Sequence, residues 1–245
     1  LKLNLEAHEI FLDYVGECLS DKRLKIVFSG TRDEYGKIPE EVLPVREEQA
    51  ITDVADQQGI HKWAAGHYHL LKAKDFKFDV SWLRLTNTYG PRQQMKDPKR
   101  GVLNWFIRKA IDNKMLELWG GGKSLRDFNY IDDVVDALIL TMVSKKTNGK
   151  IYNLGSCLRE GGKIKYLCGN VVSIEEVAQK IVRISESGRC IKKDWPSGKK
   201  DIYLGHFCAD IEKINKDIGW QPRLELDEGL RRTIEFYKKN KQHYW

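Results

Sequence analysis

The sequence has no hydrophobic run long enough to cross a membrane. Such a helix needs about 20 mostly apolar residues, whereas the longest candidate, residues 134–143 (VVDALILTMV), is short and interrupted by Asp136. No signal peptide is visible, and the chain opens at Leu1 as if in mid-helix, so we expect the true N-terminus to lie upstream. With 41% hydrophobic and 31% charged residues, the 245-residue chain is predicted to be globular and cytoplasmic, with no membrane partner.

Cysteine is scarce and is not paired along the sequence. The five cysteines are odd in number and include no C-x-x-C, which argues against a disulfide framework or a zinc site and favours reduced thiols. His67 and His69 lie two apart on a predicted helix and would point to different faces, so they are poor metal partners. We therefore expect no metal site.

The common glycine-rich phosphate loops are also missing. No G-x-G-x-x-G occurs, and WGGGKS at 119–124 is not a Walker loop, because Glu117 stands where that loop needs its first glycine. If the protein binds a dinucleotide, we expect its phosphate loop upstream of Leu1.

Basic residues outnumber acidic ones, giving a formal net charge of +7, and lysines gather at 192–200 and 236–245. A solvated basic surface is one interpretation, and attraction to an anionic small molecule or to nucleic acid is the other. No nucleic-acid-binding motif accompanies the charge, so we expect no nucleic-acid partner.

The first 90 residues alternate between helix and strand patterns. Residues 5–19 and 56–76 predict helices, and continuous apolar runs at 24–30 and 79–87 are typical of strands buried on both faces. This order predicts a parallel sheet with helices packed on it.

The second half mixes shorter elements and predicts a smaller α+β lobe. Its expected helices are 102–113, 133–144, 177–185, 209–219 and one from about Asp227, and its expected strands are 116–120, 126–131 and 151–156. Residues 157–168 are interpreted as a loop insertion. Asp132 or Asp133 is a candidate N-cap, Ser173 and Glu176 have capping-box spacing, and Gly219 is a candidate C-cap.

Gln58 and Lys62 lie four residues apart and share a helix face. The preceding strand ends in FSGT at 28–31, and its last residues would lie at the carboxyl edge of a parallel sheet, where ligands bind in open α/β folds. Thr31 and Lys62 therefore form a candidate polar site. The alternative is a threonine in a turn and a lysine on an ordinary helix.

Several segments, in order, resemble the extended short-chain dehydrogenase/reductase superfamily and, within it, the NAD-dependent nucleotide-sugar epimerase/dehydratase family. They are VFSGTRDEYG (27–36), QGIHK (58–62, at the family's Y-x-x-x-K), LRLTNTYGPR (83–92), LELWGGGKSLRDFNYIDDVVDAL (116–138), IYNLGS (151–156), SIEEVA (173–178), ADIEKINKDIGWQP (209–222) and LDEGLRRTIEFY (226–237). Together they cover nearly the whole chain.

The resemblance implies a Rossmann-like doubly wound parallel sheet, with its N-terminal part missing, and a smaller α+β substrate-binding lobe. Residues 1–90 would be the C-terminal part of the NAD-binding domain. Residues 91–245 would be mainly the substrate lobe, with crossings back to the first domain. The resemblance also implies a homodimer, formed through helices 5–19 and 61–72.

The same resemblance assigns roles to individual residues. The catalytic set would be Thr31, Lys62 and Gln58, with Thr31 hydrogen-bonding the reacting sugar oxygen. NAD would be bound by Lys62, Ser29 and Gly30. A nucleotide-diphosphate sugar would be bound by Asn87, Arg126 and Trp119. Arg126 would pair with the diphosphate, for which a guanidinium is well shaped. The alternatives are that Asn87 satisfies a turn, Arg126 joins a local ion pair and Trp119 belongs to the core.

Two departures from the family pattern affect function. Gln58 stands at the family's catalytic tyrosine, and an amide cannot accept and release a proton at neutral pH. His61, or Thr31 acting with water, could take over the proton transfer. Arg32 and Asp33 follow the threonine where dehydratases carry Asp-Glu, which argues against 4,6-dehydration.

We therefore expect an NAD-dependent nucleotide-sugar epimerase, similar to UDP-glucose 4-epimerase. The alternatives are a 4,6-dehydratase, a keto-sugar reductase, or a catalytically impaired nucleotide-sugar-binding protein.

Overall fold

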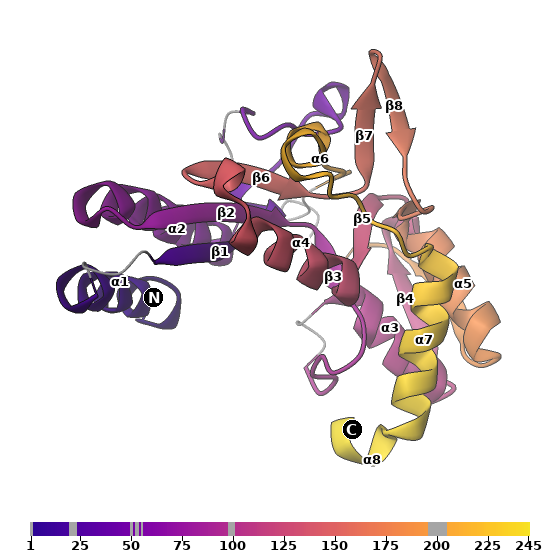
Figure 1. Ribbon diagram of the computed structural model, residues 1–245. Coiled ribbons are helices and arrows are strands. Elements are labelled where there is room, and N and C mark those ends of the chain that lie inside the picture. The colour runs from indigo at the N-terminus through magenta and orange to yellow at the C-terminus, as the bar shows by residue number, and fades with distance from the viewer. Residues whose placement is uncertain are drawn as a thin grey trace.

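The computed structural model describes residues 2–19, 24–49, 51, 54, 56–97, 101–195 and 205–245 (Figure 1). Part of the predicted basic stretch 192–200, from residue 196 on, lies outside these ranges. The helices are α1 (Ala7–Cys18), α2 (Gln57–Phe76), α3 (Val102–Ile111), α4 (Ile131–Val143), α5 (Ile174–Ser185), α6 (Glu212–Ile218), α7 (Leu226–Lys239) and α8 (Lys241–Tyr244), with a π-helix (Lys2–Glu6) and short 3₁₀ turns at Arg32–Tyr35, Glu40–Val42, Gly120–Gly122 and Lys145–Thr147. The strands are β1 (Lys25–Thr31), β2 (Asp79–Leu85), β3 (Asn87–Tyr89), β4 (Met115–Trp119), β5 (Leu125–Tyr130), β6 (Lys150–Leu154), β7 (Cys157–Glu160), β8 (Lys163–Tyr166), β9 (Val171–Ser173) and β10 (Arg189–Lys193).

A parallel sheet in the order β1–β2–β6 forms the centre of the first half of the chain. Its strands are apolar because helices cover both faces. Trp82 on β2 packs with Ala65 of α2, whereas its neighbour Leu83 packs with Val134 of α4 on the opposite face. Figure 1 shows α1 beside α2 and α4 across the sheet. This arrangement confirms the predicted doubly wound α/β fold.

The register of this sheet places the candidate site. Thr31, the last residue of β1, is opposite Leu85, the last residue of β2, so both strands end at the same edge. The chain then runs through β3, which pairs with β5, into the second half. It returns with β6, which completes the first sheet.

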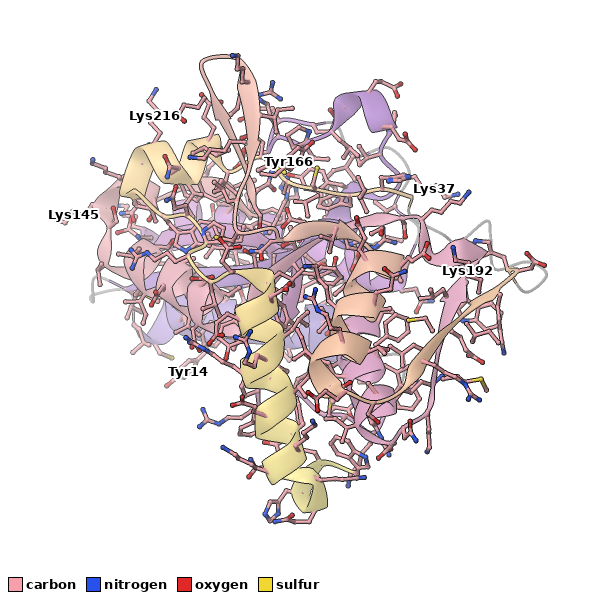
Figure 2. The ribbon with its side chains drawn as sticks, turned by 90° about the vertical axis from the view of Figure 1, so that its right-hand side faces the viewer. Tyr14, Lys37, Lys145, Tyr166, Lys192 and Lys216 are labelled. Carbon is pink, nitrogen blue, oxygen red and sulfur yellow. The ribbon has the colours of Figure 1, made fainter. Side chains whose placement is uncertain are left out.

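Much of the second half forms a separate core of helices on short sheets, whereas α4, β6 and α6 pack into the core of the first sheet. β4 pairs with β10, and β5 joins β3 and β9. The apolar face of α7 packs into the separate core through Leu230, Ile234 and Tyr237, each of which is at most 1% exposed. Figure 2 shows α7 running along the outside of this half.

Residues 157–168 form an antiparallel hairpin, β7–β8, rather than the predicted loop. It projects from the molecule in Figure 1. Cys157 and Leu158 on β7 are buried, while every residue of β8 is exposed. Gly161 and Gly162 turn the chain with φ of 56° and 79°, the conformation that two-residue hairpin turns require. The glycine pair was therefore a usable hairpin signal.

The predicted helix caps had mixed outcomes. Ser173 and Glu176 form the expected capping box, and Gly219 ends α6 in the left-handed conformation. The predicted cap at Asp132 or Asp133 is wrong, because α4 begins earlier, with Tyr130 at its N-cap position. The Asp133 carboxylate instead accepts a hydrogen bond from the backbone of Leu224 at 3.1 Å.

Within the described ranges, no helix is both long and apolar enough to cross a membrane. In the same ranges, no cluster of three or more His, Cys, Asp or Glu side chains is arranged to hold a metal ion. All five cysteines are free thiols.

Candidate active site

Thr31 sits at the junction between β1 and the 3₁₀ turn that follows it. Its hydroxyl accepts a hydrogen bond from the Asp33 backbone at 3.3 Å, and its own N–H donates to Glu34 Oε1 at 2.9 Å. This reciprocal capping box fixes the turn at the carboxyl edge of the sheet. The Thr31 side chain is thereby held at a defined position.

A buried ion pair between Glu34 and Arg84 anchors this turn to β2. Arg84 Nε donates to Glu34 Oε2 at 2.8 Å, and the guanidinium also donates to the Tyr35 hydroxyl at 2.9 Å. Tyr35 in turn donates to Asn153 on β6 at 2.8 Å. Burial raises the pKa of Tyr35 to about 12 and raises that of Glu34, which the charge of Arg84 opposes. Sequence reasoning missed this network.

Lys62 reaches β1 from α2. Its ammonium donates to the Ser29 carbonyl at 2.9 Å and lies 5.0 Å from the centre of the Phe28 ring. Burial lowers the pKa of Lys62, an effect that the Glu34 charge opposes. Within the described residues, one of its three N–H groups is engaged in a hydrogen bond, which leaves two for a ligand.

Lys62 and Ser29 line a cavity of about 370 Å³ between β1, α1 and α2. His8 and His69 line it as well, and burial lowers the pKa of both, that of His69 to about 4. Burial thus favours the neutral form of both imidazoles, and Lys62 is the one lysine or arginine among the described residues that line this cavity.

Gln58 is exposed in the first turn of α2, beside the Thr31 turn. Asp56 caps this helix by accepting a hydrogen bond from Gly59 N–H at 2.7 Å. A Cβ atom on Gly59 would lie 2.5 Å from the carbonyl oxygen of Asp33, so the backbones of the two segments touch. His61, one turn further on, is half-buried and has no hydrogen bond to Thr31 among the described contacts.

Gly30 faces the protein interior rather than an open pocket. A Cβ atom there would lie 2.2 Å from Trp82 Nε1 and 2.5 Å from Glu34 Oε1. A Cβ atom on Gly66 would lie 2.4 Å from the same indole ring. Packing thus accounts for glycine at position 30, and its role toward a cofactor stays a prediction.

Asn87 lies on β3, just beyond the end of β2. Its Oδ1 atom is buried without a hydrogen-bond partner in the described part of the chain, and so is Thr88 Oγ1. Buried polar atoms are normally paired. These two atoms are therefore candidates for contact with a ligand.

Arg126 and Trp119 belong to the second half of the chain. Arg126 lies on β5, is 8% exposed and donates to the backbone carbonyls of Leu125 and Gly205. Trp119 is the last residue of β4 and is 36% exposed. The centre of its ring lies 5.3 Å from Lys193 Nζ. The structure therefore groups the predicted residues of β1 and α2. Asn87 and Arg126 lie in a second sheet, on the paired strands β3 and β5, and Trp119 lies in a third sheet, on β4.

Comparison with known proteins identifies the class to which this fold and site belong. Residues 3–155 match the model of the NAD dependent epimerase/dehydratase family. This chain belongs to that family, whose members are enzymes.

Individual relatives carry several different activities. The chain is 30% identical over 221 residues to a putative UDP-glucose 4-epimerase of Methanocaldococcus jannaschii, covering 88% of this chain and 64% of the relative. It is 33% identical over 165 residues to a UDP-N-acetyl-alpha-D-glucosaminuronate decarboxylase of Bacillus cytotoxicus, covering 65% and 46%. The chain thus spans about half to two thirds of these relatives.

Solved structures support the fold. A UDP-glucose 4-epimerase from Thermotoga maritima, solved with UDP-glucose, superimposes with a TM-score of 0.81 at 24% identity, covering 98% of this chain and 71% of that one. Nearly all of the present chain therefore has a counterpart in that fold.

Proposed function

We propose that the protein containing this chain is an NAD-dependent nucleotide-sugar 4-epimerase. One observation carries the proposal: Lys62 reaches from α2 to the Ser29 carbonyl at 2.9 Å, two residues before Thr31 on β1. The Lys62 ammonium and the Thr31 hydroxyl thus lie near the same end of β1, at the sheet edge where α/β folds bind ligands. Family membership supports an oxidation–reduction at a sugar carbinol.

The residues present fit NAD. Lys62 has two N–H groups that bond no described residue and could serve the hydroxyls of a ribose, and Ser29 lines the same cavity. NAD⁺, when bound, supplies the acceptor for a hydride. The buried, unpartnered Oδ1 of Asn87 and Oγ1 of Thr88 offer hydrogen bonds to a polar ligand beside it.

The turn after Thr31 argues against 4,6-dehydration. The position of the dehydratases' aspartic acid holds Arg32, whose Nε pairs with Asp33 at 3.2 Å. A guanidinium cannot protonate a leaving hydroxyl group at neutral pH. The exposed Gln58 favours one other candidate, a protein that binds nucleotide sugars without converting them.

Product analysis tests the proposal. The full-length protein with NAD is mixed with UDP-, GDP-, CDP- and dTDP-sugars, including UDP-glucuronate. We expect an epimeric pair from at least one of them, with no net formation of NADH. Net loss of water, loss of carbon dioxide or net use of NADPH would identify a different reaction. Tight binding without conversion of any sugar would favour the binding protein.

We further propose a homodimer built on α1 and α2. Ile10 and Tyr14 on α1 are 71% and 59% exposed, and Leu71 on α2 is 55% exposed. An exposed apolar surface of this kind marks an interaction site. The five free cysteines support a reducing compartment such as the cytoplasm.

Replacing Ile10 and Tyr14 together by glutamate is expected to convert the dimer into a monomer, because two charges would have to be buried at the interface. Sedimentation of the full-length protein measures this. Ile164→Glu on the exposed strand β8 is the control and should leave the dimer intact. A double variant that stays dimeric would place the interface elsewhere.

A further inference from the structure

The Thr31 hydroxyl is hydrogen-bonded to a carboxylate, that of Asp33. Thr31 Oγ1 donates to Asp33 Oδ2 at 3.0 Å and accepts from the Asp33 N–H at 3.3 Å. A hydroxyl group has one proton to donate and two lone pairs. Its proton is therefore committed to the carboxylate, and one lone pair remains to accept a proton from another hydroxyl group.

A contact at its other carboxylate oxygen, Oδ1, holds Asp33 in this orientation. Arg32 Nε lies 3.2 Å from Asp33 Oδ1, which leaves Oδ2 directed at Thr31. The Arg32 guanidinium also lies 5.2 Å from the centre of the Phe207 ring. The two charged side chains are only 12% and 22% exposed. The carboxylate is thus positioned before any substrate arrives, which is the condition for efficient proton transfer.

Asp33 also lies against the helix turn that carries Gln58. The contact between its carbonyl and Gly59 brings the two segments together at the start of α2. Gln58 is exposed at this point, and its amide is no proton acceptor. Asp33 is therefore next to the position from which the family's tyrosine would act.

Among the described residues, the other ionisable groups around Thr31 do not accept its hydroxyl proton. Glu34 uses Oε1 for the Thr31 N–H and Oε2 for Arg84. Lys62, as an ammonium, only donates. His61 has no hydrogen bond to Thr31 in the part of the chain that the structure describes. Asp33 is the carboxylate that receives the hydroxyl proton.

The geometry points to Asp33 as the proton acceptor of this site, acting through Thr31 in place of a tyrosine at position 58. This inference rests on the proposed epimerase function. In an oxidation of a sugar carbinol, for which bound NAD⁺ would supply the hydride acceptor, the carbinol O–H proton would pass to Thr31 Oγ1 while the proton of Thr31 passes to Asp33 Oδ2. The carbinol would become a ketone and the Asp33 carboxylate a neutral carboxyl group, and the reverse proton transfers would restore the alcohol in the second half of the epimerisation.

Asp33→Asn in the full-length protein with NAD tests this role. We expect kcat to fall on the order of 10²–10⁴-fold, as for the loss of a general base. The dissociation constant of the nucleotide sugar, measured by calorimetry, should change less than about threefold, because Asp33 contacts Thr31 rather than the sugar. Asp136→Asn, an exposed carboxylate on α4, is the matched control and should keep the wild-type rate.

Two rescue experiments separate proton transfer from a structural role. Added formate should raise kcat of Asp33→Ala by supplying a carboxylate in the vacated space. Gln58→Tyr in the Asp33→Asn background should raise kcat at least about tenfold, because a phenol four residues before Lys62 can take the proton directly. A damaged turn would respond to neither.

The outcomes distinguish this inference from the proposed function. If the wild-type protein epimerises a nucleotide sugar and Asp33→Asn does so at the same rate, the role of Asp33 is wrong and the function stands. If Asp33→Asn is slow and neither rescue restores it, Asp33 only supports the turn. If the wild-type protein converts no nucleotide sugar, both the function and the role of Asp33 are rejected.

Discussion

Replacing Arg84 by methionine is expected to lower the free energy of unfolding by about 3–5 kcal/mol, the cost of breaking a buried ion pair. The Glu34 side chain is fully buried, and Arg84 Nε is 2.8 Å from its Oε2 atom. Without Arg84 the carboxylate would have to stay charged and unpaired, or be protonated. The Tyr35 hydroxyl would also lose the hydrogen bond from Arg84. Urea unfolding of the wild-type protein and the variant measures the difference.

The charge left behind, rather than lost packing, should dominate this effect. Adding Glu34→Gln to Arg84→Met removes the unpaired charge and should recover part of the lost stability. Arg231→Met is the surface control, because Arg231 pairs with Glu228 on the exposed face of α7, and such pairs contribute little. Equal losses in the Arg84 and Arg231 variants would contradict the assignment of a buried ion pair.

Local patterns were enough to predict the elements that carry the site. The apolar runs of β1 and β2 and the helical period of α2 come directly from residue order. The spacing of Gln58 and Lys62 put both on one face of a helix. Thr31 was expected near them because it ends a strand at the carboxyl edge of a parallel sheet. Lys62 indeed reaches β1, at Ser29.

Contacts between distant residues could not be predicted in the same way. Nothing in the sequence pairs Glu34 with Arg84, 50 residues later, because that contact depends on the register of β1 and β2. The hydrogen bond from Thr31 to Asp33 depends on side-chain rotamers within one turn. Trp119 and Arg126 do lie on strands outside the β1 sheet, as expected from the separate second-half lobe, but the pairing of β4 with β10 and of β5 with β3 and β9 could not be read from residue order.

Asp127, on β5, is also a buried carboxylate. It lies beside the segment that follows β6 and the segment that precedes α6. Its Oδ2 atom accepts hydrogen bonds from the backbone N–H groups of Ser156 at 3.0 Å and Ala209 at 3.1 Å. Burial raises its pKa from 3.8 to about 6, although these hydrogen bonds oppose the shift. The folded protein therefore binds a proton at Asp127 more tightly than the unfolded chain does.

This shift makes Asp127 a source of pH-dependent stability. Because the folded pKa is the higher one, its contribution is fully present below pH 3.8 and is lost as the pH rises through about 6. The loss amounts to about 3 kcal/mol, given 1.36 kcal/mol for each pKa unit. Asp127→Asn removes the charge and keeps an oxygen for both N–H groups. Relative to wild type, the variant should therefore gain about 3 kcal/mol of stability between pH 3 and pH 7.5.

Urea unfolding of both proteins at a series of pH values isolates this contribution. Glu34, Glu47 and Asp133, whose pKa values burial also raises, are present in both proteins, so their titration cancels in the difference. Asp136→Asn, on the exposed face of α4, is the matched surface control. A difference between Asp127→Asn and wild type that does not vary with pH would mean that Asp127 titrates alike in the folded and unfolded states. The Asp127 carboxylate would then be exposed to water in solution. Its hydrogen bonds from the Ser156 and Ala209 N–H groups would not exclude solvent from this position on β5.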